Sequence, residues 1–322
     1  MPVMNIANQA NLDAARVGFH AAFLAQLGLV PNMPLEAAFA QLNSTTTTEE
    51  WDWIGDFPGF SEWIGDRPMA TLQAFKMRLA NRDWSSGLRV HQNQFKDDKL
   101  GLFPLSTAGL AVAARQHRSD MMIQLLINGF AGTTYPDISN GLAYDGKFFF
   151  DATRVTGSNK LTTALDDTGA GLDAAELLLG SQTTYDGKRK LRIQGSHLIV
   201  GPKLAPIARR LTTLDFIASV SGAAAGQATI SNPYKGRYQV IIDPWLTGTY
   251  DDYWFLADLT QAVKPALFQL REEISTSAIL GQQGGSNDSE PRFKRGEYWF
   301  GAEARYNVGY FEPRLIVGSQ VA

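Results

Sequence analysis

Cysteine is absent from this sequence of 322 residues, so disulfide bridges, cysteine-based zinc sites and thiol nucleophiles are excluded. Histidine is scarce, and the 4 His residues stand too far apart for a helical zinc-binding pair. Charged residues make up only 19%, and the net charge of −3 gives no overall basic field that would hold nucleic acid. These absences disfavour a metalloenzyme and a DNA-binding role for the whole chain.

Targeting and membrane segments are also missing. The N-terminal segment has no basic start followed by an apolar run, so no signal peptide is predicted. The longest uncharged stretch, Phe216 to Tyr234, is rich in Ser, Gly, Gln, Asn and Thr and is too polar to span a bilayer. We therefore expect a soluble, cytoplasmic protein without a membrane partner.

Catalytic motifs are not found either. The sequence has no G-x-S-x-G nucleophile elbow, and its nearest phosphate-loop candidate, residues 141–147, is followed by Phe148 where magnesium binding needs Ser or Thr. Adjacent acids can bind a divalent cation, although a solvated turn explains each pair more simply: Asp97-Asp98, Asp166-Asp167 and Asp251-Asp252. We expect no enzyme, no cofactor and no metal site; the enzyme alternative is a hydrolase whose carboxylates converge only in the fold.

Apolar residues make up 44% of the chain, enough for one large core or two medium ones. Their spacing predicts helices at residues 12–27, 106–128, 172–179 and 204–211. Strands are predicted at residues 197–200, 238–242, 253–257, 298–304 and 315–317, whereas 265–275 fit either type and 282–291 have a loop composition. The predicted fold class is α+β, without an internal repeat.

An irregular aromatic segment follows the Ser/Thr run at residues 43–48, which has the composition of an extended linker. Its large side chains follow no period of 2 or 3.6: Trp51, Trp53, Phe57, Phe60 and Trp63. They need a surface to pack against, because large exposed apolar patches are rare in soluble monomers. That surface is either the chain's own core or another chain, since aromatic residues are enriched in both.

Residues 71–96 alternate in a way that predicts a long β-hairpin, with a turn formed by Asn81, Asp83, Ser85, Ser86 and Gly87. A two-stranded ribbon with few apolar residues is marginal alone in water, so we expect this hairpin to pack elsewhere. Residues 1–66 carry eight acids and one base, whereas residues 67–99 carry seven bases and three acids. These charges either face water or steer the basic hairpin of one subunit onto an acidic surface of another.

Short segments occur in an ordered set along the chain: the Ser/Thr run, Trp51–Gly55, Phe57-Pro58, Trp63–Arg67, Asp97–Leu105, Leu125–Phe130, Tyr144–Phe149, Leu198–Val200 with Pro202 and Leu204, and Asn232-Pro233. Each is weak alone, but in this order they resemble the major head subunit family of Mu-like phages, often called gpT. The sequence departs from the family pattern after its phenylalanine run, where it reads Asp151-Ala152-Thr153-Arg154.

The resemblance implies the Hong Kong 97-type capsid fold. Its parts would be an N-terminal arm at residues 1–66, an extended E-loop hairpin at 67–98, a peripheral domain at 99–164 and 261–322 with a long spine helix at 106–128, and an axial domain at 165–260. By this resemblance we expect a major capsid (head) protein that self-assembles into hexamers and pentamers of an icosahedral or related shell enclosing phage DNA. An encapsulin-like nanocompartment shell protein of the same fold is the alternative.

The resemblance also implies the partners. These are further copies of the chain, separate scaffold and portal proteins, and packaged DNA through weak non-specific contact, with assembly in the host bacterial cytoplasm and a final location in the virion capsid. We expect residues 1–42 to stay uncut. Candidates for contact between subunits are Trp51, Trp53, Trp63, Phe75, Lys76, Arg78, Trp84 and Arg89. Several of these tryptophans should then be well exposed in a single chain.

Overall fold

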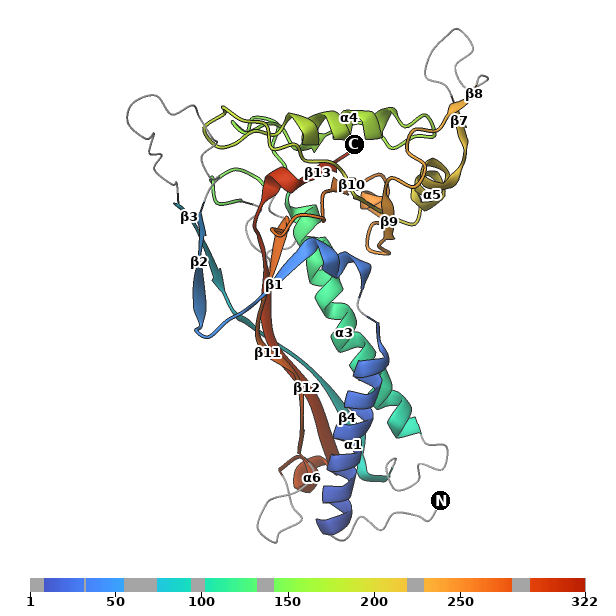
Figure 1. Cartoon of the computed structure of the whole chain (residues 1–322). Coiled ribbons are helices and arrows are strands. Elements are labelled where there is room, and N and C mark those ends of the chain that lie inside the picture. The colour runs from blue at the N-terminus through green and yellow to red at the C-terminus, as the bar shows by residue number, and fades with distance from the viewer. Residues whose placement is uncertain are drawn as a thin grey trace. The chain divides into compact units, whose positions relative to one another are not determined.

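The computed structural model describes residues 9–31, 33–54, 74–93, 102–131, 142–218, 229–279 and 290–321 (Figure 1). The chain divides into two compact units, each with its own apolar clusters. The first unit comprises Met1–Met33, Asn81–Ser119 and Leu270–Tyr306, and the second comprises Pro34–Ala80, Asp120–Gln269 and Asn307–Ala322.

The first unit is built on long antiparallel strands covered by helices. It contains α1 (Gln9–Leu29), β4 (Arg82–His91), α6 (Glu290–Arg295) and large parts of α3 (Leu102–Asn128), β11 (Ala266–Ile279) and β12 (Glu297–Tyr310). Strand β12 pairs antiparallel with β4. The helix predicted at residues 12–27 is confirmed as α1, whose buried Phe19 packs with Tyr298 and Phe300. Its Phe23 packs with Ile274, so the apolar face of α1 is covered by the chain itself.

The second unit centres on a five-stranded sheet of order β5-β13-β10-β6-β9. Its elements are η1 (Pro34–Ala38), β1 (Phe39–Asn43), β2 (Thr48–Ile54), β3 (Ala74–Ala80), β5 (Lys160–Leu161), α4 (Ala170–Ser181), β6 (His197–Val200), α5 (Ala205–Thr213), β7 (Phe216–Ala218), β8 (Thr229–Ser231), β9 (Gln239–Ile242), η2 (Gly248–Tyr250), β10 (Trp254–Ala257), η3 (Pro313–Leu315) and β13 (Ile316–Ser319). Strands β1, β11, β12 and β4 follow in that order in a second sheet.

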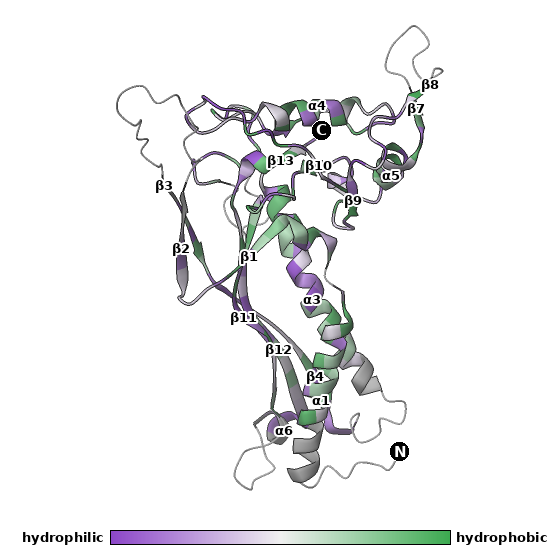
Figure 2. Cartoon of the chain, viewed as in Figure 1, coloured by the Kyte–Doolittle hydropathy of each residue, from purple (hydrophilic) through white to green (hydrophobic). Residues whose placement is uncertain are grey.

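The core of the second unit forms where helices α4 and α5 meet the central strands. All four residues of β10 are buried, as expected for a strand covered on both faces. Helix α4 contributes Leu172, Ala175 and Leu179 at helical spacing, and α5 contributes Ala208 and Leu211. Figure 2 shows strand β1 in green, whereas the charged middle of β11 is purple. The helices and strands predicted between residues 172 and 257 are confirmed.

The hairpin predicted at residues 71–96 is wrong. Strands β3 and β4 both exist, but only Asn81 separates them, which is too short for a hairpin turn. Strand β3 pairs with β2 instead, and β4 pairs with β12. The alternating residues do form strands, but the expected turn residues from Asp83 to Gly87 are part of strand β4, where they lie opposite β12.

Two other boundaries differ from expectation. Helix α3 begins at Leu102, earlier than the predicted residue 106, and Pro104 lies in the first turn, where a missing N–H costs no intrahelical hydrogen bond. The segment 265–275, which fitted either type, is a strand from Ala266 onwards, within β11. Most of the loop expected at 282–291 lies outside the described residues, and its last two residues begin α6.

The buried strand β10 provides a test of the second core. Leu256 is 0% exposed, and replacing it with Ala removes buried methyl groups and leaves a cavity. We expect Leu256→Ala to lower the free energy of unfolding by about 2–5 kcal/mol in a urea titration. Leu177→Ala on α4 is the matched control, because Leu177 is 73% exposed and should change stability by less than about 0.5 kcal/mol. Equal effects of the two variants would contradict the assigned core.

Candidate functional site

Seven of the eight candidate contact residues fall on two different strand pairs. Trp51, Trp53, Phe75, Lys76 and Arg78 lie on β2 and β3, which form a two-stranded sheet that we call the β2–β3 ribbon (residues 48–54 and 74–80). Trp84 and Arg89 lie on β4 in the first unit. Trp63 lies outside the described residues, and for Trp53 and Phe75 the backbone alone is described.

The register of the β2–β3 ribbon separates apolar from charged residues. Trp51 lies opposite Met77, and Glu50 lies opposite Arg78. Directly opposed side chains share a face, and neighbouring residues alternate between faces. One face of the ribbon therefore carries Trp51, Met77 and Leu79, while the other carries Glu50 and Arg78.

The apolar face of the ribbon packs against other residues of the second unit, to which the ribbon itself belongs. Trp51 donates from Nε1 to Gln269 Oε1 at 2.8 Å, and Gln269 donates from Nε2 to the Leu79 carbonyl at 3.2 Å. A Cβ on Gly309 of β12 would come within 3.0 Å of Met77 Cε and 3.2 Å of Leu79 Cδ2, so glycine permits the close approach. Part of the aromatic segment is thus packed on the chain itself.

The charged face is exposed and carries both signs. Lys76 Nζ lies 3.9 Å from Glu50 Oε2, with side chains 67% and 58% exposed. Such an exposed pair contributes only about 0.2–1 kcal/mol. Charges of the acidic and basic segments, which were expected to face either water or another subunit, therefore lie opposite each other within one chain. Their charged side chains remain accessible to a neighbour.

A tight turn precedes the ribbon where an extended linker was expected. Glu49 Oε1 accepts hydrogen bonds from the backbone N–H groups of Thr45 at 2.6 Å and Thr46 at 2.8 Å, and from Ser44 Oγ at 3.0 Å. The backbone hydrogen bonds from Thr45 and then Thr46 lower the pKa of Glu49 to about 2, because they stabilise the carboxylate. The Ser/Thr run thus supplies the donors that start strand β2.

The two candidates on β4 have different surroundings. Trp84 is half-buried, donates from Nε1 to the Tyr306 carbonyl at 2.9 Å, and lies with its ring 4.6 Å from that of His117. It borders a pocket of about 250 Å³. Arg89 is exposed and lies opposite Trp299. Neither Trp51 nor Trp84 is well exposed, contrary to the expectation for these two tryptophans.

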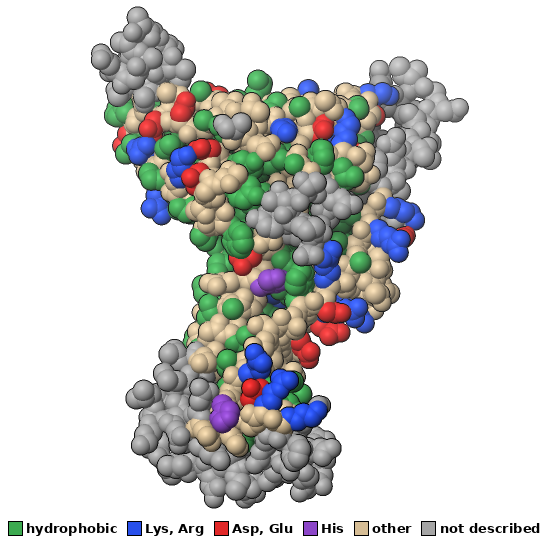
Figure 3. All heavy atoms as spheres, turned by 180° about the vertical axis from the view of Figure 1, so that it is seen from behind, with side chains coloured by type: hydrophobic (Ala, Val, Ile, Leu, Met, Phe, Trp, Pro, Cys, Tyr) green, Lys and Arg blue, Asp and Glu red, His purple; other side chains and the backbone are tan. Residues whose placement is uncertain are grey.

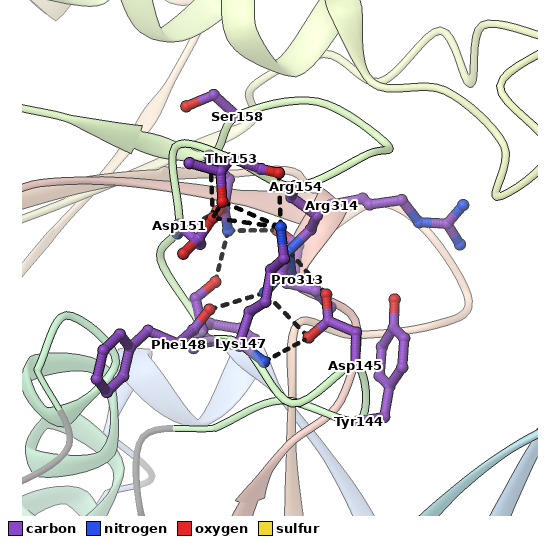
Figure 4. Close-up of polar contacts among 12 residues, drawn as sticks. Tyr144, Asp145, Lys147, Phe148, Asp151, Thr153, Arg154, Ser158, Pro313 and Arg314 are labelled. Atoms are coloured by element: carbon purple, nitrogen blue, oxygen red, sulfur yellow. Dashed lines mark hydrogen bonds and ion pairs between the residues drawn. The ribbon is translucent and has the colours of Figure 1, made fainter.

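The loop that departs from the family pattern is a closed polar network (Figure 4). Asp151 Oδ1 accepts from Thr153 N at 2.6 Å and from Thr153 Oγ1 at 2.8 Å, and Lys147 Nζ donates to the Thr153 carbonyl at 2.6 Å. Buried Arg154 places its Nε 3.2 Å from Asp145 Oδ2. Both carboxylates are occupied by cations or local donors, so this arrangement holds the loop together and presents no activated base.

A buried ion pair lies beside this network. Arg314 donates from Nε and from one terminal nitrogen to the two carboxylate oxygens of Glu312, each at 2.8 Å, and the side chains are 3% and 4% exposed. The guanidinium stacks 4.0 Å above the centre of the Tyr185 ring. Two parallel bonds satisfy both charges, which makes the pair a geometric clamp.

No candidate for catalysis or metal binding emerges within the described part of the chain. No group of three or more metal-binding side chains is found there, and none of its helices is long and apolar enough to cross a membrane. Asp166 caps a turn through Thr168 Oγ1 at 2.7 Å, and Asp167 binds Arg210 at 2.8 Å. These contacts agree with the solvated-turn interpretation of that acid pair, while Asp97-Asp98 lies outside the described residues.

Comparison with known proteins gives consistent similarities. The sequence profile of the family described as Mu-like prophage major head subunit gpT matches residues 12–179 and 247–322, more than half of the chain. The Mu-like prophage FluMu major head subunit of Haemophilus influenzae is 23% identical over 299 residues, covering 93% of this chain and 70% of that protein. The major capsid protein of Escherichia phage Mu is 26% identical over 146 residues, 45% of this chain and 43% of that protein.

Solved structures share the fold. The procapsid of bacteriophage JBD30 aligns with a TM-score of 0.56 and 22% identity over 98% of this chain and 76% of that one. A chain from Microbacterium phage Oxtober96 aligns with a TM-score of 0.53 and 11% identity over 91% of this chain and 92% of that one. The mixed α+β architecture is therefore that of phage capsid structures.

The turn at Glu49 has a pH dependence that can be measured. Its pKa is lower in the folded chain than the usual 4.5, so its contribution to stability is complete above pH 4.5 and is lost as pH falls through about 2. We expect the Glu49 carboxyl resonance to titrate near pH 2 in NMR spectra of the folded protein. Glu49→Gln should speed amide exchange at Thr45 and Thr46. A titration midpoint at the ordinary value would contradict the assigned hydrogen bonds.

Proposed function

Because this chain belongs to the Mu-like prophage major head subunit family, we propose that it forms the hexamers and pentamers of a closed phage head around DNA. It is a major capsid protein, a structural component of the virion that assembles with copies of itself, and not an enzyme. The family match across both ends of the chain carries this conclusion and favours a phage head over a nanocompartment shell. Separate scaffold and portal proteins are its proposed further partners.

The proposed domain layout follows the Hong Kong 97-type capsid fold with both ends of the extended loop moved. The pairing of β2 with β3 supports an extended loop at residues 48–80, in place of 67–98, and shortens the N-terminal arm accordingly. Helix α3 takes the place of the spine helix, within a peripheral domain of residues 99–164 and 261–322. The sheet strands β6, β9 and β10 with helices α4 and α5 support an axial domain at 165–260.

The proposed contact between subunits is the charged face of the β2–β3 ribbon. Its apolar face is covered by the chain's own second unit, whereas Glu50, Lys76 and Arg78 remain exposed. Each exposed ion pair is weak, but every subunit of a shell repeats it, so the contributions add over the lattice. Such charges would set register and speed docking more than they raise affinity.

A charge swap separates contact within the chain from contact between subunits. In the double variant Lys76→Glu/Arg78→Glu, both charges are reversed; the quadruple variant adds Glu50→Lys and Asp52→Lys, which restores opposite charges across the register. We expect both variants to fold and both to assemble poorly. The association constant between subunits should fall about tenfold for every 1.4 kcal/mol, roughly, that is lost at a contact. Sedimentation and electron microscopy of shells, with circular dichroism of the monomers, provide the measurements.

Salt provides the control for the wild-type chain. Assembly should weaken as ionic strength rises, since exposed charges are screened beyond about 8 Å at physiological salt. Normal assembly of the quadruple variant alone would show that these charges act only within the chain. Normal assembly of both variants, with unchanged salt tolerance, would overturn the proposed contact.

A further inference from the structure

A concentrated basic segment follows helix α4. Residues 183–192, which we call the basic hairpin, carry one acid and the four exposed cations Lys188, Arg189, Lys190 and Arg192. The segment lies between the two parts of the chain that the family profile matches, so family membership assigns it no role. The net charge of −3 conceals this local concentration.

Backbone hydrogen bonds hold the basic hairpin in one conformation. Thr184 N donates to the Arg189 carbonyl at 2.8 Å, and Gly187 N donates to the Thr184 carbonyl at 2.8 Å. Asp186, the one acid of the segment, accepts from Thr184 Oγ1 and from Lys188 N at 3.0 Å. The hairpin therefore uses its own carboxylate to close its turn, and a rigid backbone lowers the entropy lost when its cations bind a ligand.

Two further features distinguish the basic hairpin from an ordinary surface loop. Its Tyr185 lies beneath the guanidinium of buried Arg314 and directs its hydroxyl towards Glu312, at 3.4 Å, so the segment is anchored in the second unit. Exposed Arg192 has a φ of 55°, in the left-handed region that side chains other than glycine rarely adopt. Strained backbone of this kind is concentrated at functional sites.

Several exposed cations of the same unit are matched by carboxylates. Opposite charges lie next to each other at several places on the face shown in Figure 3. Ion pairs in the second unit join Arg210 with Asp167 at 2.7 Å, Lys203 with Asp252 at 2.8 Å, Arg237 with Glu176 at 3.2 Å, and Lys235 with Asp215. Within the described residues, by contrast, Lys188 and Arg192 make no ion pair with a carboxylate.

We propose that the basic hairpin binds the phosphate groups of duplex nucleic acid inside the head, an inference that rests on the proposed function. Four cations within five residues present a local positive field to a repeating anion. An acidic segment of a second copy is the competing occupant; among the described acids of residues 1–66, Glu49 already accepts the hydrogen bonds of its own turn. The contact is to phosphate and carries no base specificity.

Duplex binding by the full-length chain tests the proposal. If the four cations neutralise four phosphates, affinity for a fluorescent DNA duplex should fall about 150-fold between 50 and 200 mM salt, following a slope of about −3.6. The variant Lys188→Gln/Arg189→Gln/Lys190→Gln/Arg192→Gln should lose most of this binding and of its salt dependence. The matched control Lys203→Gln/Arg210→Gln/Lys235→Gln/Arg237→Gln removes equal charge from paired cations and should bind as the wild type does.

The outcomes of the binding experiment are distinct. Equal loss in both variants would show that net charge alone matters and would overturn the proposal. Displacement of the duplex by polyglutamate at equal charge concentration would overturn it in favour of an acidic polypeptide. Shell formation by the hairpin variant is scored separately by electron microscopy, so the proposed function stands or fails independently of DNA binding.

A measurement on the unmodified protein covers the case in which the variant misfolds. Lysine acylation of DNA-filled and empty heads, followed by mass spectrometry, compares Lys188 and Lys190 with the reference Lys203. We expect several-fold lower acylation of Lys188 in filled heads and no change at Lys203. Equal acylation of Lys188 in filled and empty heads would show that the hairpin does not touch packaged DNA.

Discussion

The buried pair of Glu312 and Arg314 is the interaction on which the second unit depends. Two hydrogen bonds of 2.8 Å satisfy both carboxylate oxygens, and removing one partner would leave an uncompensated buried charge, at about 3–5 kcal/mol. The pair lies just before β13, an inner strand of the five-stranded sheet, and Arg314 also stacks on Tyr185. One clamp therefore holds both the C-terminal strand and the basic hairpin.

A capsid subunit must be stable alone and yet keep surfaces for its neighbours. The β2–β3 ribbon meets both demands, because its apolar face is tied to Gln269 and Gly309 while its charged face remains open. Weak exposed ion pairs suit this purpose, since strong pairwise contacts would trap misplaced subunits before a closed shell forms. Specificity then comes from many repeated contacts.

The sequence predicted element types better than element partners. Helices α1, α3, α4 and α5 were found from apolar spacing, since that period depends only on local residues. The partner of β3 was not, because the aromatic segment around Trp51 was expected to be irregular although it forms β2, and only the short link at Asn81 excludes a hairpin of β3 with β4. The family resemblance was confirmed, whereas the contact roles of all eight candidate residues remain predictions.

The local charges show why bulk composition is an incomplete guide. A net charge of −3 argued against a DNA-binding role for the whole chain, yet four cations stand between positions 188 and 192, a run that a window of charge along the sequence would have found. Cryo-electron microscopy of heads assembled from this chain tests the account most directly. We expect such a reconstruction to show the charged face of the β2–β3 ribbon lying against a neighbouring subunit. A closed shell in which this face meets only solvent would contradict it.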